Sequence, residues 1–421
     1  MMNFINKLFQ RSKNLNYISL RFKKMYLETE VKKIFEAINN FSEDSELRYV
    51  GGCVRKIINK EIMDDIDLAT NLTPKEVSAT LNKFDIQFHE TGIKHGTITA
   101  KINNDKFEIT SLRRDIKTDG RHAIVEYSKN WHEDASRRDF SINAIYADVD
   151  GNLFDPFNGK KKIEEGIVEF IGEEEERIKE DYLRILRYVR FFLSYSKNNH
   201  NFSTIKAIRK NIDGINKISP ERLLDEFKKF VKSEGFLKLN KDKFCLEIIN
   251  LIFPQFKRTD ILKNLTKKNI QNLDFILLLS LLIIDGSDNT KYFLYKFKVS
   301  NNDKKRILFL DEFFSKKIDK KTFSRINLWK EFYYNGKQSL LDLLNYQIFK
   351  TKNLEEKLLA EIEFFKDKEC PSMPIKADFL MKEYNINEGK VLGLKLKKIE
   401  EKWISNNFKI SDEEVKKLIL S

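Results

Sequence analysis

The sequence predicts an α+β chain, with a mixed β-sheet in its N-terminal part and helices in the remainder. Two observations lead to this fold class. Runs of apolar and β-branched residues typical of strands are concentrated between residues 47 and 170. Beyond about residue 174, apolar residues recur at helical spacing in a segment rich in Leu, Ile, Phe and Lys. The length of 421 residues allows two or more domains.

A strand, a glycine turn and a helix are predicted in succession between residues 47 and 60. Residues 47–50 form a short apolar run, and residues 54–60 have helical spacing. Between them, Gly51 and Gly52 let the backbone turn tightly and approach a ligand closely. The N–H groups at the start of a helix attract phosphate, and the guanidinium of Arg55 can bind phosphate oxygens. On its own, a Gly-Gly pair is more often only a turn.

Asp65 and Asp67 are the most informative pair of residues in the sequence. We expect residues 62–70 to form a strand, in which alternate side chains point to opposite faces. The two carboxylates would then share one face. Carboxylate oxygens are preferred by hard cations such as Mg²⁺, so the pair predicts metal-dependent phosphoryl or nucleotidyl transfer. The alternative is a solvated Asp-X-Asp loop without a catalytic role.

Two helices can be delimited from the sequence alone. Thr73, Pro74 and Glu76 make a capping box with proline at the first helical position, which predicts a helix start. The longest apolar run, residues 275–284, lies between two aspartates and is too short to span a bilayer. We therefore expect a buried helix there and no transmembrane helix.

Residues 131–146 hold a second group of polar side chains. Apolar and polar residues alternate from 139 to 144, which favours an extended segment after a helical turn. Arg138 and Asn143 can bind triphosphate or ribose oxygens if they lie near a nucleotide site. The alternative is that Arg137 and Arg138 are a surface pair engaged in structural ion pairs.

Residues 180–190 predict a helix with two different faces. One face is apolar and consists of Tyr182, Ile185, Leu186, Val189 and Phe192. On the other face, Asp181, Arg184, Arg187 and Arg190 follow one another at i, i+3 spacing, so Asp181 and Arg184 are expected to be neighbours on one turn. A helical salt bridge, worth about 0.2–0.5 kcal/mol, is the alternative explanation, but it does not require three arginines.

The charge and the cysteine content narrow the class of protein. The net charge of +13 indicates an anionic partner, although charged residues of both signs make up 33% of the chain and much of that is ordinary helix surface. Three widely separated cysteines and five histidines without zinc spacing indicate a reducing compartment and no disulfide framework. Residues 1–27 contain six basic and no acidic side chains. We expect a basic surface extension there, with a mitochondrial presequence as the minor alternative.

Together these segments resemble the class II CCA-adding tRNA nucleotidyltransferases, within the poly(A) polymerase family. The resemblance covers about residues 47–230 and keeps the family's motif order. The matching stretches are GGCVRKIINKEIMDDIDLAT at 51–70, TGIKHGT at 91–97, TSLRRDIKTDGRHAIVEY at 110–127, EDASRRDFSINAIY at 133–146, DPFNGKKKIEEG at 155–166, EDYLRILRYVRF at 180–191 and ISPERLLDEFKKF at 218–230. Beyond residue 230 the chain resembles the family only in being helical and basic.

The resemblance implies a polymerase-beta-like nucleotidyltransferase head followed by an all-helical neck, body and tail. It also implies a role for each candidate site residue. The catalytic and Mg²⁺-binding residues would be Asp65 and Asp67. The nucleotide-binding residues would be Gly52, Arg55 and Arg138 at the triphosphate, Asp181 and Arg184 as the amino-acid template for the incoming base, and Arg187 and Arg190 as further phosphate and base contacts.

The template role has a clear physical basis. Cytosine and adenine both present an exocyclic amine beside a ring-nitrogen acceptor, which match a carboxylate and a guanidinium respectively. Uracil and guanine would set a carbonyl against the carboxylate. Buried polar groups would then be left unmatched, at a cost of several kcal/mol, and these bases would be rejected.

Other positions refine the resemblance. The commoner family pattern has Asp where this chain has Lys56, so the local salt bridge must differ. Glu108 is a candidate third acid. Within residues 110–127, the segment from Arg113 through Arg121 resembles the family's flexible loop. In the family this loop is linked to the switch from C to A addition. No histidine-aspartate phosphohydrolase motif is present downstream, so we predict no second hydrolase activity.

We therefore predict four parts: a basic N-terminal extension at 1–26, a catalytic head at 27–172, a neck with the nucleobase-selecting helix at 173–235, and a tRNA-binding body and tail at 236–421. The predicted activity is template-independent addition of CCA to the tRNA 3′ end, from CTP and ATP with Mg²⁺, in the cytoplasm and without a membrane partner. The alternatives are a poly(A) polymerase with the same head, a partial enzyme adding only CC or only A, and a catalytically silent tRNA-binding protein. The sequence makes no prediction of oligomeric state.

Overall fold

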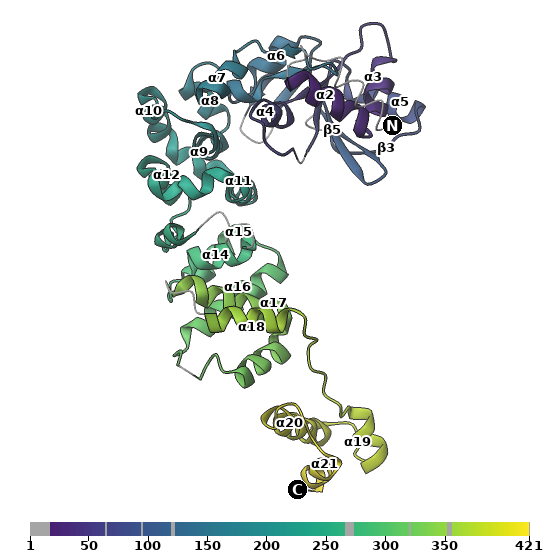
Figure 1. Ribbon diagram of the computed structural model, residues 1–421, viewed down its shortest axis with the longest axis vertical. Helices are drawn as coiled ribbons and strands as arrows, with labels where there is room; N and C mark the ends of the chain where they lie inside the picture. Colours follow the sequence, from purple (N-terminus) through teal and green to yellow (C-terminus); the bar gives the residue numbers. More distant parts are fainter. Residues whose placement is uncertain are drawn as a thin grey trace. The chain divides into compact units, whose positions relative to one another are not determined.

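The computed structural model describes residues 17–63, 65–93, 96–118, 123–265, 273–319, 321–351 and 356–420. The chain forms two compact units, Met1–Ile252 and Phe253–Ser421, coloured purple to teal and green to yellow respectively in Figure 1. The predicted domain boundaries after residues 172 and 235 stay predictions.

A seven-stranded mixed sheet forms the centre of the first unit. Its strands are β1 (Leu47–Val50), β2 (Asp67–Thr70), β3 (Gln87–Gly92), β4 (Thr97–Ile102), β5 (Asp105–Ser111), β8 (Tyr146–Ala147) and β9 (Leu153–Phe154). They are ordered β3-β4-β5-β2-β1-β8-β9, and β2 and β5 run parallel while β1 and β2 run antiparallel. A separate hairpin pairs β6 (Arg113–Thr118) with β7 (Ala123–Tyr127). The predicted mixed sheet is therefore confirmed.

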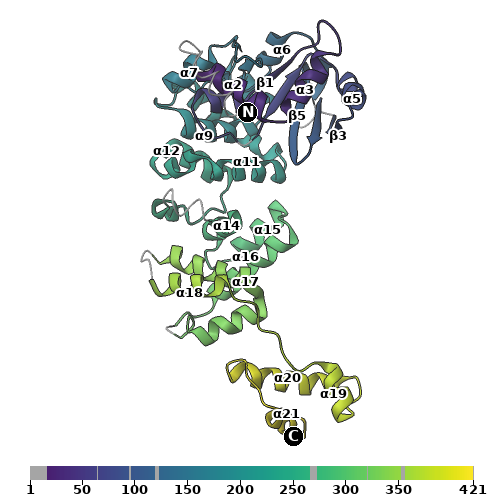
Figure 2. The same cartoon turned by 45° about the vertical axis from the view of Figure 1, so that its right-hand side comes forward.

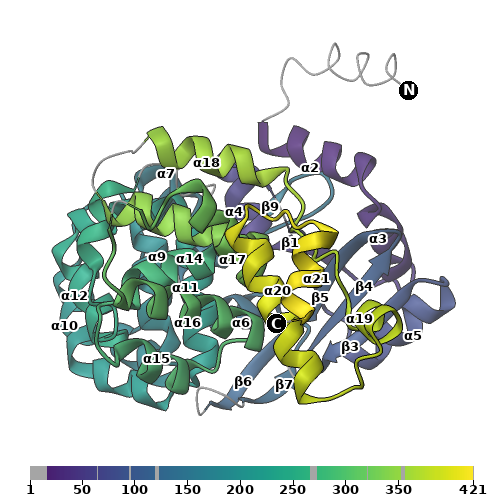
Figure 3. The same cartoon turned by 90° about the horizontal axis from the view of Figure 1, so that it is seen from below.

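Apolar residues alternate along the strands, so that one face of this sheet is buried in the core. In β4, Ile98, Ala100 and Ile102 are buried and the residues between them are partly exposed. Helices α3 (Val31–Asn39) and α5 (Pro74–Lys83) pack beside one another, α3 against β1 and α5 against β3 and β4. Figure 3 shows both helices at this end of the sheet.

Both helices delimited from the sequence are confirmed. Thr73 caps α5 by accepting a hydrogen bond from the Glu76 backbone N–H, and the Glu76 carboxylate accepts one from the Thr73 N–H at 2.7 Å. In the second unit, α14 spans Phe275–Ile283, and Ile276 to Ile283 are all buried. Asp274 caps it by accepting a hydrogen bond from the Ile276 N–H at 2.8 Å.

Residues 17–26, predicted to belong to the basic extension, instead form part of the head. Helix α2 (Tyr17–Glu28) buries Ile18, Phe22 and Met25, and the Phe22 ring lies 5.1 Å from the ring of Tyr49 in β1. Gly151 has a positive φ of 81°, and a Cβ on it would lie 2.6 Å from the Ser19 Cα. The helix was missed because its three basic side chains, Arg21, Lys23 and Lys24, continue the basic run of the preceding residues. Residues 1–16 lie outside the described part of the chain.

Two local predictions near the site are wrong in detail. The strand expected at 62–70 begins only at Asp67, so Asp65 precedes it. The alternation at 139–144 does not make a strand, because residues 141–143 form the single 3₁₀ turn η2 (Ser141–Asn143) and every residue from 139 to 144 is buried. The Asp139 and Asn143 side chains are hydrogen-bonded within the protein, so the alternation does not mark a solvent-facing side.

The rest of the first unit is helical apart from connecting segments. Its elements are α4 (Gly52–Ile58), α6 (Trp131–Ser136), α7 (Gly159–Glu165), α8 (Glu174–Glu180), α9 (Leu183–Tyr195), α10 (Phe202–Asn211), η3 (Ile212–Lys217), α11 (Pro220–Lys232), η4 (Glu234–Lys241) and α12 (Lys243–Ile252). Helix α9 contacts α8, α11, α12 and η4. Its predicted apolar face is confirmed, since Ile185, Leu186 and Val189 are fully buried.

The second unit has no described strand. Besides α14 it contains η5 (Thr259–Asn264), α15 (Asn289–Phe297), α16 (Asn301–Ser315), α17 (Arg325–Lys350), α18 (Glu356–Lys366), α19 (Ala377–Tyr384), α20 (Lys390–Ser405) and α21 (Asp412–Leu420). Helix α17 is kinked at Gly336, whose φ is 79°. Helices α19, α20 and α21, labelled in Figure 2, share a small hydrophobic core of their own. Among the described residues, no helix has the length and apolar character needed to cross a membrane.

Candidate active site

An open cleft of about 1250 Å³ in the first unit brings all nine predicted site residues together. These are Gly52, Arg55, Asp65, Asp67, Arg138, Asp181, Arg184, Arg187 and Arg190. The lining contains ten Lys and Arg side chains against six Asp and Glu side chains. The cleft is therefore suited to a polyanion, with its acidic side chains available for a cation.

The acidic side chains gather where β2 begins. Asp67 is the first residue of β2, and Glu108 lies opposite it on the parallel strand β5. Burial raises the pKa of Asp67 above its ordinary value, and the charges of Glu108 and Asp65 raise it further. Arg138 and Arg55 oppose this rise. A cation held between carboxylates would relieve their repulsion, and such a set of hard oxygen donors fits a divalent ion such as Mg²⁺.

The glycine turn brings the backbone close to these acids. A Cβ built on Gly52 would lie 3.5 Å from the Asp67 Oδ2, in van der Waals contact with the carboxylate. Gly51 has a positive φ of 65°, which favours glycine, and its N–H already donates to the Ile145 carbonyl at 3.3 Å. The predicted turn is thus present, with one of its N–H groups used within the protein.

Arg55 is buried at the wall of the cleft. Its Nη1 donates to the Asn143 Oδ1, and its guanidinium lies 4.8 Å from the Phe191 ring centre and 5.0 Å from that of Tyr195. Its Nε is buried and has no hydrogen-bond partner among the described residues. An unpaired buried N–H beside a cleft is a donor left for a ligand.

Arg138 is held firmly by neighbours that sequence reasoning did not assign. Its Nε and Nη2 donate to the buried Asp134 Oδ2 at 3.2 and 3.1 Å, and its Nη1 donates to the Asn143 carbonyl at 3.3 Å. The Tyr146 hydroxyl donates to the same Asp134 Oδ2 at 2.6 Å. The alternative of structural ion pairs is therefore correct for part of this guanidinium, which also lines the cleft.

Asp139 and Glu226 anchor the arginines of α9. Arg187 Nε donates to Asp139 Oδ2 at 2.6 Å, and Arg190 Nε donates to Glu226 Oε1 at 2.6 Å. Burial alone would raise the pKa of Asp139, but the charge and hydrogen bond of Arg187 outweigh it and hold that pKa well below its ordinary value. Both acids lie within stretches that resemble the family, Asp139 in 133–146 and Glu226 in 218–230, but no local pattern indicated that they pair with arginines of α9.

Asp181 and Arg184 line the same cleft and are neighbours on one turn, where the Arg184 N–H donates to the Asp181 carbonyl at 3.0 Å, but Asp181 precedes α9 and does not lie within it. Helix α8 ends at Glu180, and the backbone of Asp181 is extended. The side-chain Oδ1 of Asp181 accepts a hydrogen bond from the Leu183 N–H at 3.1 Å and so caps α9. The Asp181 Oδ2 pairs with Arg222 at 2.7 Å. Arg184 instead pairs with the Glu180 Oε2 at 2.7 Å. A capping aspartate must leave the helix to reach its N–H groups, which helical spacing cannot reveal.

The predicted flexible loop falls partly outside the described residues. Arg113 and Arg114 begin β6, and Arg114 pairs with Glu126 across the hairpin at 2.7 Å. Arg121 lies in the undescribed segment 119–122. Lys56 lines the cleft close to Arg55.

Comparison with known proteins identifies the family. Residues 47–169 match the poly A polymerase head domain, and residues 201–258 match the family described as "Probable RNA and SrmB- binding site of polymerase A". The chain is 33% identical over 386 residues to CCA tRNA nucleotidyltransferase 1, mitochondrial, of Mus musculus, covering 89% of this chain and 86% of that protein. It is 29% identical over 382 residues to the CCA-adding enzyme of Staphylococcus haemolyticus, covering 88% and 90%.

Solved structures share the fold. The Bacillus stearothermophilus CCA-adding enzyme in complex with CTP matches with a TM-score of 0.68 at 21% identity, covering 93% of this chain and 96% of that one. The Thermotoga maritima CCA-adding enzyme complexed with tRNA matches with a TM-score of 0.58 at 18% identity, covering 96% and 98%. The sequence identity to the mouse protein extends over most of both chains, and the chain therefore belongs to the CCA tRNA nucleotidyltransferase family.

Proposed function

We propose that the chain adds C, C and A in order to the 3′ end of tRNA, using CTP and ATP and no nucleic acid template. One observation carries this proposal. The acids at Asp65 and Asp67 and the charged groups at the start of α9 line a single cleft. A site that joins nucleotidyl transfer to base selection needs both groups within reach of one nucleotide.

In the proposed reaction, the tRNA 3′ hydroxyl attacks the α-phosphorus of the nucleoside triphosphate and pyrophosphate leaves. Asp65 and Asp67 would hold the divalent metal, which we propose to be Mg²⁺, with Glu108 as a candidate third ligand. When bound, such an ion supplies a lower pKa for the attacking hydroxyl and offsets charge at the leaving oxygen. The carboxylates and the parallel β2–β5 pair provide the rigid support for this position.

Arg55 and Arg138 are proposed to bind the triphosphate. The unpaired Nε of Arg55 supports its part, because phosphate oxygens would satisfy that buried donor. Arg138 is oriented by Asp134 and Tyr146, so little side-chain entropy is lost when it meets phosphate. Close approach of the backbone at Gly52 leaves room for the nucleotide beside Asp67.

Asp181 and Arg184 are proposed to read the base by the hydrogen-bond match described above. Both side chains have protein partners without a nucleotide, so each must exchange a partner when a base arrives. Arg222 would give up its ion pair with the Asp181 Oδ2, and Glu180 would give up its ion pair with the Arg184 Nη1. The exchange lowers affinity for every base but does not reduce discrimination, because only a matching base restores both contacts.

The lysine-rich helices beyond residue 236 are proposed to bind the tRNA through its backbone and shape, as proteins usually read RNA duplexes. The match of residues 201–258 to an RNA-binding family supports part of this. We keep the cytoplasm as the proposed compartment. The mouse and human relatives are named as mitochondrial proteins, which makes the mitochondrion the alternative compartment. Fractionation of cells that make the protein distinguishes the two compartments.

The test is direct. A tRNA that ends before CCA is incubated with CTP, ATP or both, and the 3′ ends are sequenced. The proposal predicts CC with CTP alone and CCA followed by arrest with both. Long A tails would indicate a poly(A) polymerase, and a product that stops at CC with both nucleotides, or A added only to a CC end, would indicate a partial enzyme. Tight tRNA binding without extension would indicate a silent binding protein.

A further inference from the structure

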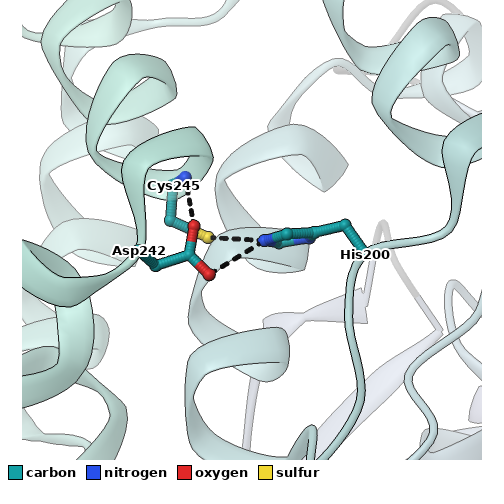
Figure 4. A group of neighbouring side chains, drawn as sticks. All are labelled: His200, Asp242 and Cys245. Carbon is teal, nitrogen blue, oxygen red and sulfur yellow. Dashed lines mark hydrogen bonds and ion pairs between the residues drawn. The ribbon is translucent and has the colours of Figure 1, made fainter.

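Three side chains with metal-binding atoms meet beside α9, none of them among the residues that line the cleft (Figure 4). His200 lies between α9 and α10, Asp242 immediately precedes α12, and Cys245 is in the first turn of α12. The His200 Nε2 is 3.0 Å from the Asp242 Oδ2 and 3.8 Å from the Cys245 Sγ. All three ligand atoms lie within 4.8 Å of one another.

These separations fit a tetrahedral ion. With zinc bonds of about 2.0 Å to nitrogen or oxygen and about 2.3 Å to sulfur, ligand atoms stand about 3.3 to 3.5 Å apart. The His200–Asp242 and His200–Cys245 distances fall on either side of these values, each within about 0.3 Å of them. The Asp242 Oδ1 accepts from the Cys245 backbone N–H at 2.8 Å, which fixes the carboxylate with its other oxygen toward His200.

The surroundings also orient the imidazole. The Tyr188 hydroxyl lies 2.9 Å from the His200 Nδ1, on the side of the ring away from Asp242. The ring stacks on Phe192, with centres 3.6 Å apart, and meets the edge of Phe244 at 4.8 Å. Metal-binding histidines are held in this way, with the second nitrogen donating its proton to a neighbouring oxygen.

We propose that the His200 Nε2, the Cys245 Sγ and the Asp242 carboxylate bind one zinc-class divalent ion, with water as the fourth ligand. On binding, the Cys245 thiol loses its proton to solvent, and the imidazole keeps its proton on Nδ1, facing Tyr188. The His200 and Asp242 side chains are 11% and 22% exposed, so water can reach the open position. The thiolate selects zinc over magnesium, which prefers oxygen.

The ion would join the segment before α10 to the start of α12, both against α9. Helix α9 also carries Arg187 and Arg190, which line the cleft. The expected consequence is a stiffer support for these arginines and a higher unfolding temperature when zinc is bound. Without an ion, the same side chains make a plain hydrogen-bonded network, and the experiment below separates the two arrangements.

The experiment titrates Co²⁺ into the chelator-treated full chain carrying Cys370→Ser, which removes the exposed cysteine. We expect a thiolate-to-cobalt charge-transfer band that saturates at one ion per chain and disappears when Zn²⁺ displaces the cobalt. Carboxylates in the cleft cannot give this band. Added Cys245→Ser should abolish it, and added Cys53→Ser, which changes the other buried cysteine, should retain it.

The absence of a band, or a band that survives Cys245→Ser in a folded variant, overturns the proposal. Circular dichroism checks folding. Should Cys245→Ser not fold, X-ray absorption of the zinc-loaded Cys370→Ser protein decides instead. One sulfur with nitrogen and oxygen neighbours supports the site, and a shell without sulfur overturns it.

Discussion

Replacing Arg184 with alanine is expected to blur the choice of base while leaving nucleotidyl transfer possible. In the proposed template role, the guanidinium donates to the ring nitrogen of cytosine or adenine. A hydrogen bond to a charged group contributes about 1.5–3 kcal/mol. At about 1.4 kcal/mol for each factor of ten, its loss should lower the preference for CTP over UTP by about 10- to 150-fold.

The structure also predicts a cost in stability. Arg184 Nη1 donates to the Glu180 Oε2 at 2.7 Å and to the Arg177 carbonyl at 2.9 Å, and its side chain is only 12% exposed. Alanine would leave these acceptors without their donor. The variant must therefore be shown to be folded before its selectivity is interpreted, and Arg184→Lys, which keeps the charge but loses the fork, provides an intermediate case.

The assay measures kcat/KM for CTP, ATP, UTP and GTP separately on a tRNA lacking CCA. Arg209→Ala is the matched control. It removes the same charge from the neighbouring helix α10, where Arg209 is exposed and pairs with Glu247. The control should leave the CTP to UTP ratio unchanged. If folded Arg184→Ala discriminates against UTP as strongly as the unaltered chain, the template assignment is refuted.

Two further variants test other parts of the site. Arg55→Ala should raise KM for both nucleotides by about 10- to 150-fold through loss of a charged phosphate contact, and an unchanged KM would contradict the triphosphate role. Asp139→Asn should lower the free energy of unfolding by about 1.5–3 kcal/mol, because it removes the charged partner of Arg187 and leaves only Glu226 at 3.7 Å; a loss below about 0.5 kcal/mol in urea titrations would contradict this. Since the pKa of Asp139 is lowered in the folded protein, its contribution is complete above its unfolded pKa near 3.9 and is lost as pH falls through the folded pKa, so Asp139→Asn should flatten the acid loss of stability.

The candidate site was largely predictable because its residues lie in short segments with strong local patterns. Gly51, Gly52 and Asp67 follow one another through a strand, a glycine turn, a helix and a second strand, whose order the local pattern indicates. The arginines of α9 were placed correctly for the same reason, since helical spacing alone puts Arg187 and Arg190 on one side.

What could not be predicted depends on contacts between distant segments. Glu226 lies 36 residues from Arg190, with which it pairs, and nothing in either local sequence indicates the other. Asp181 leaves its helix to cap the next one, which depends on where α8 stops. Helix α2 packs Phe22 against Tyr49 of β1, although its three basic side chains suggested a surface segment.

The most direct test of the account replaces Asp65 and Asp67, each in turn, with asparagine, which keeps shape and removes charge. On a tRNA lacking CCA with CTP, ATP and Mg²⁺, single-turnover addition should fall by about 10³-fold or more in each variant, while tRNA binding stays within about threefold. Addition within about tenfold of the unaltered chain in either variant would contradict the central claim that this acidic pair carries out the transfer.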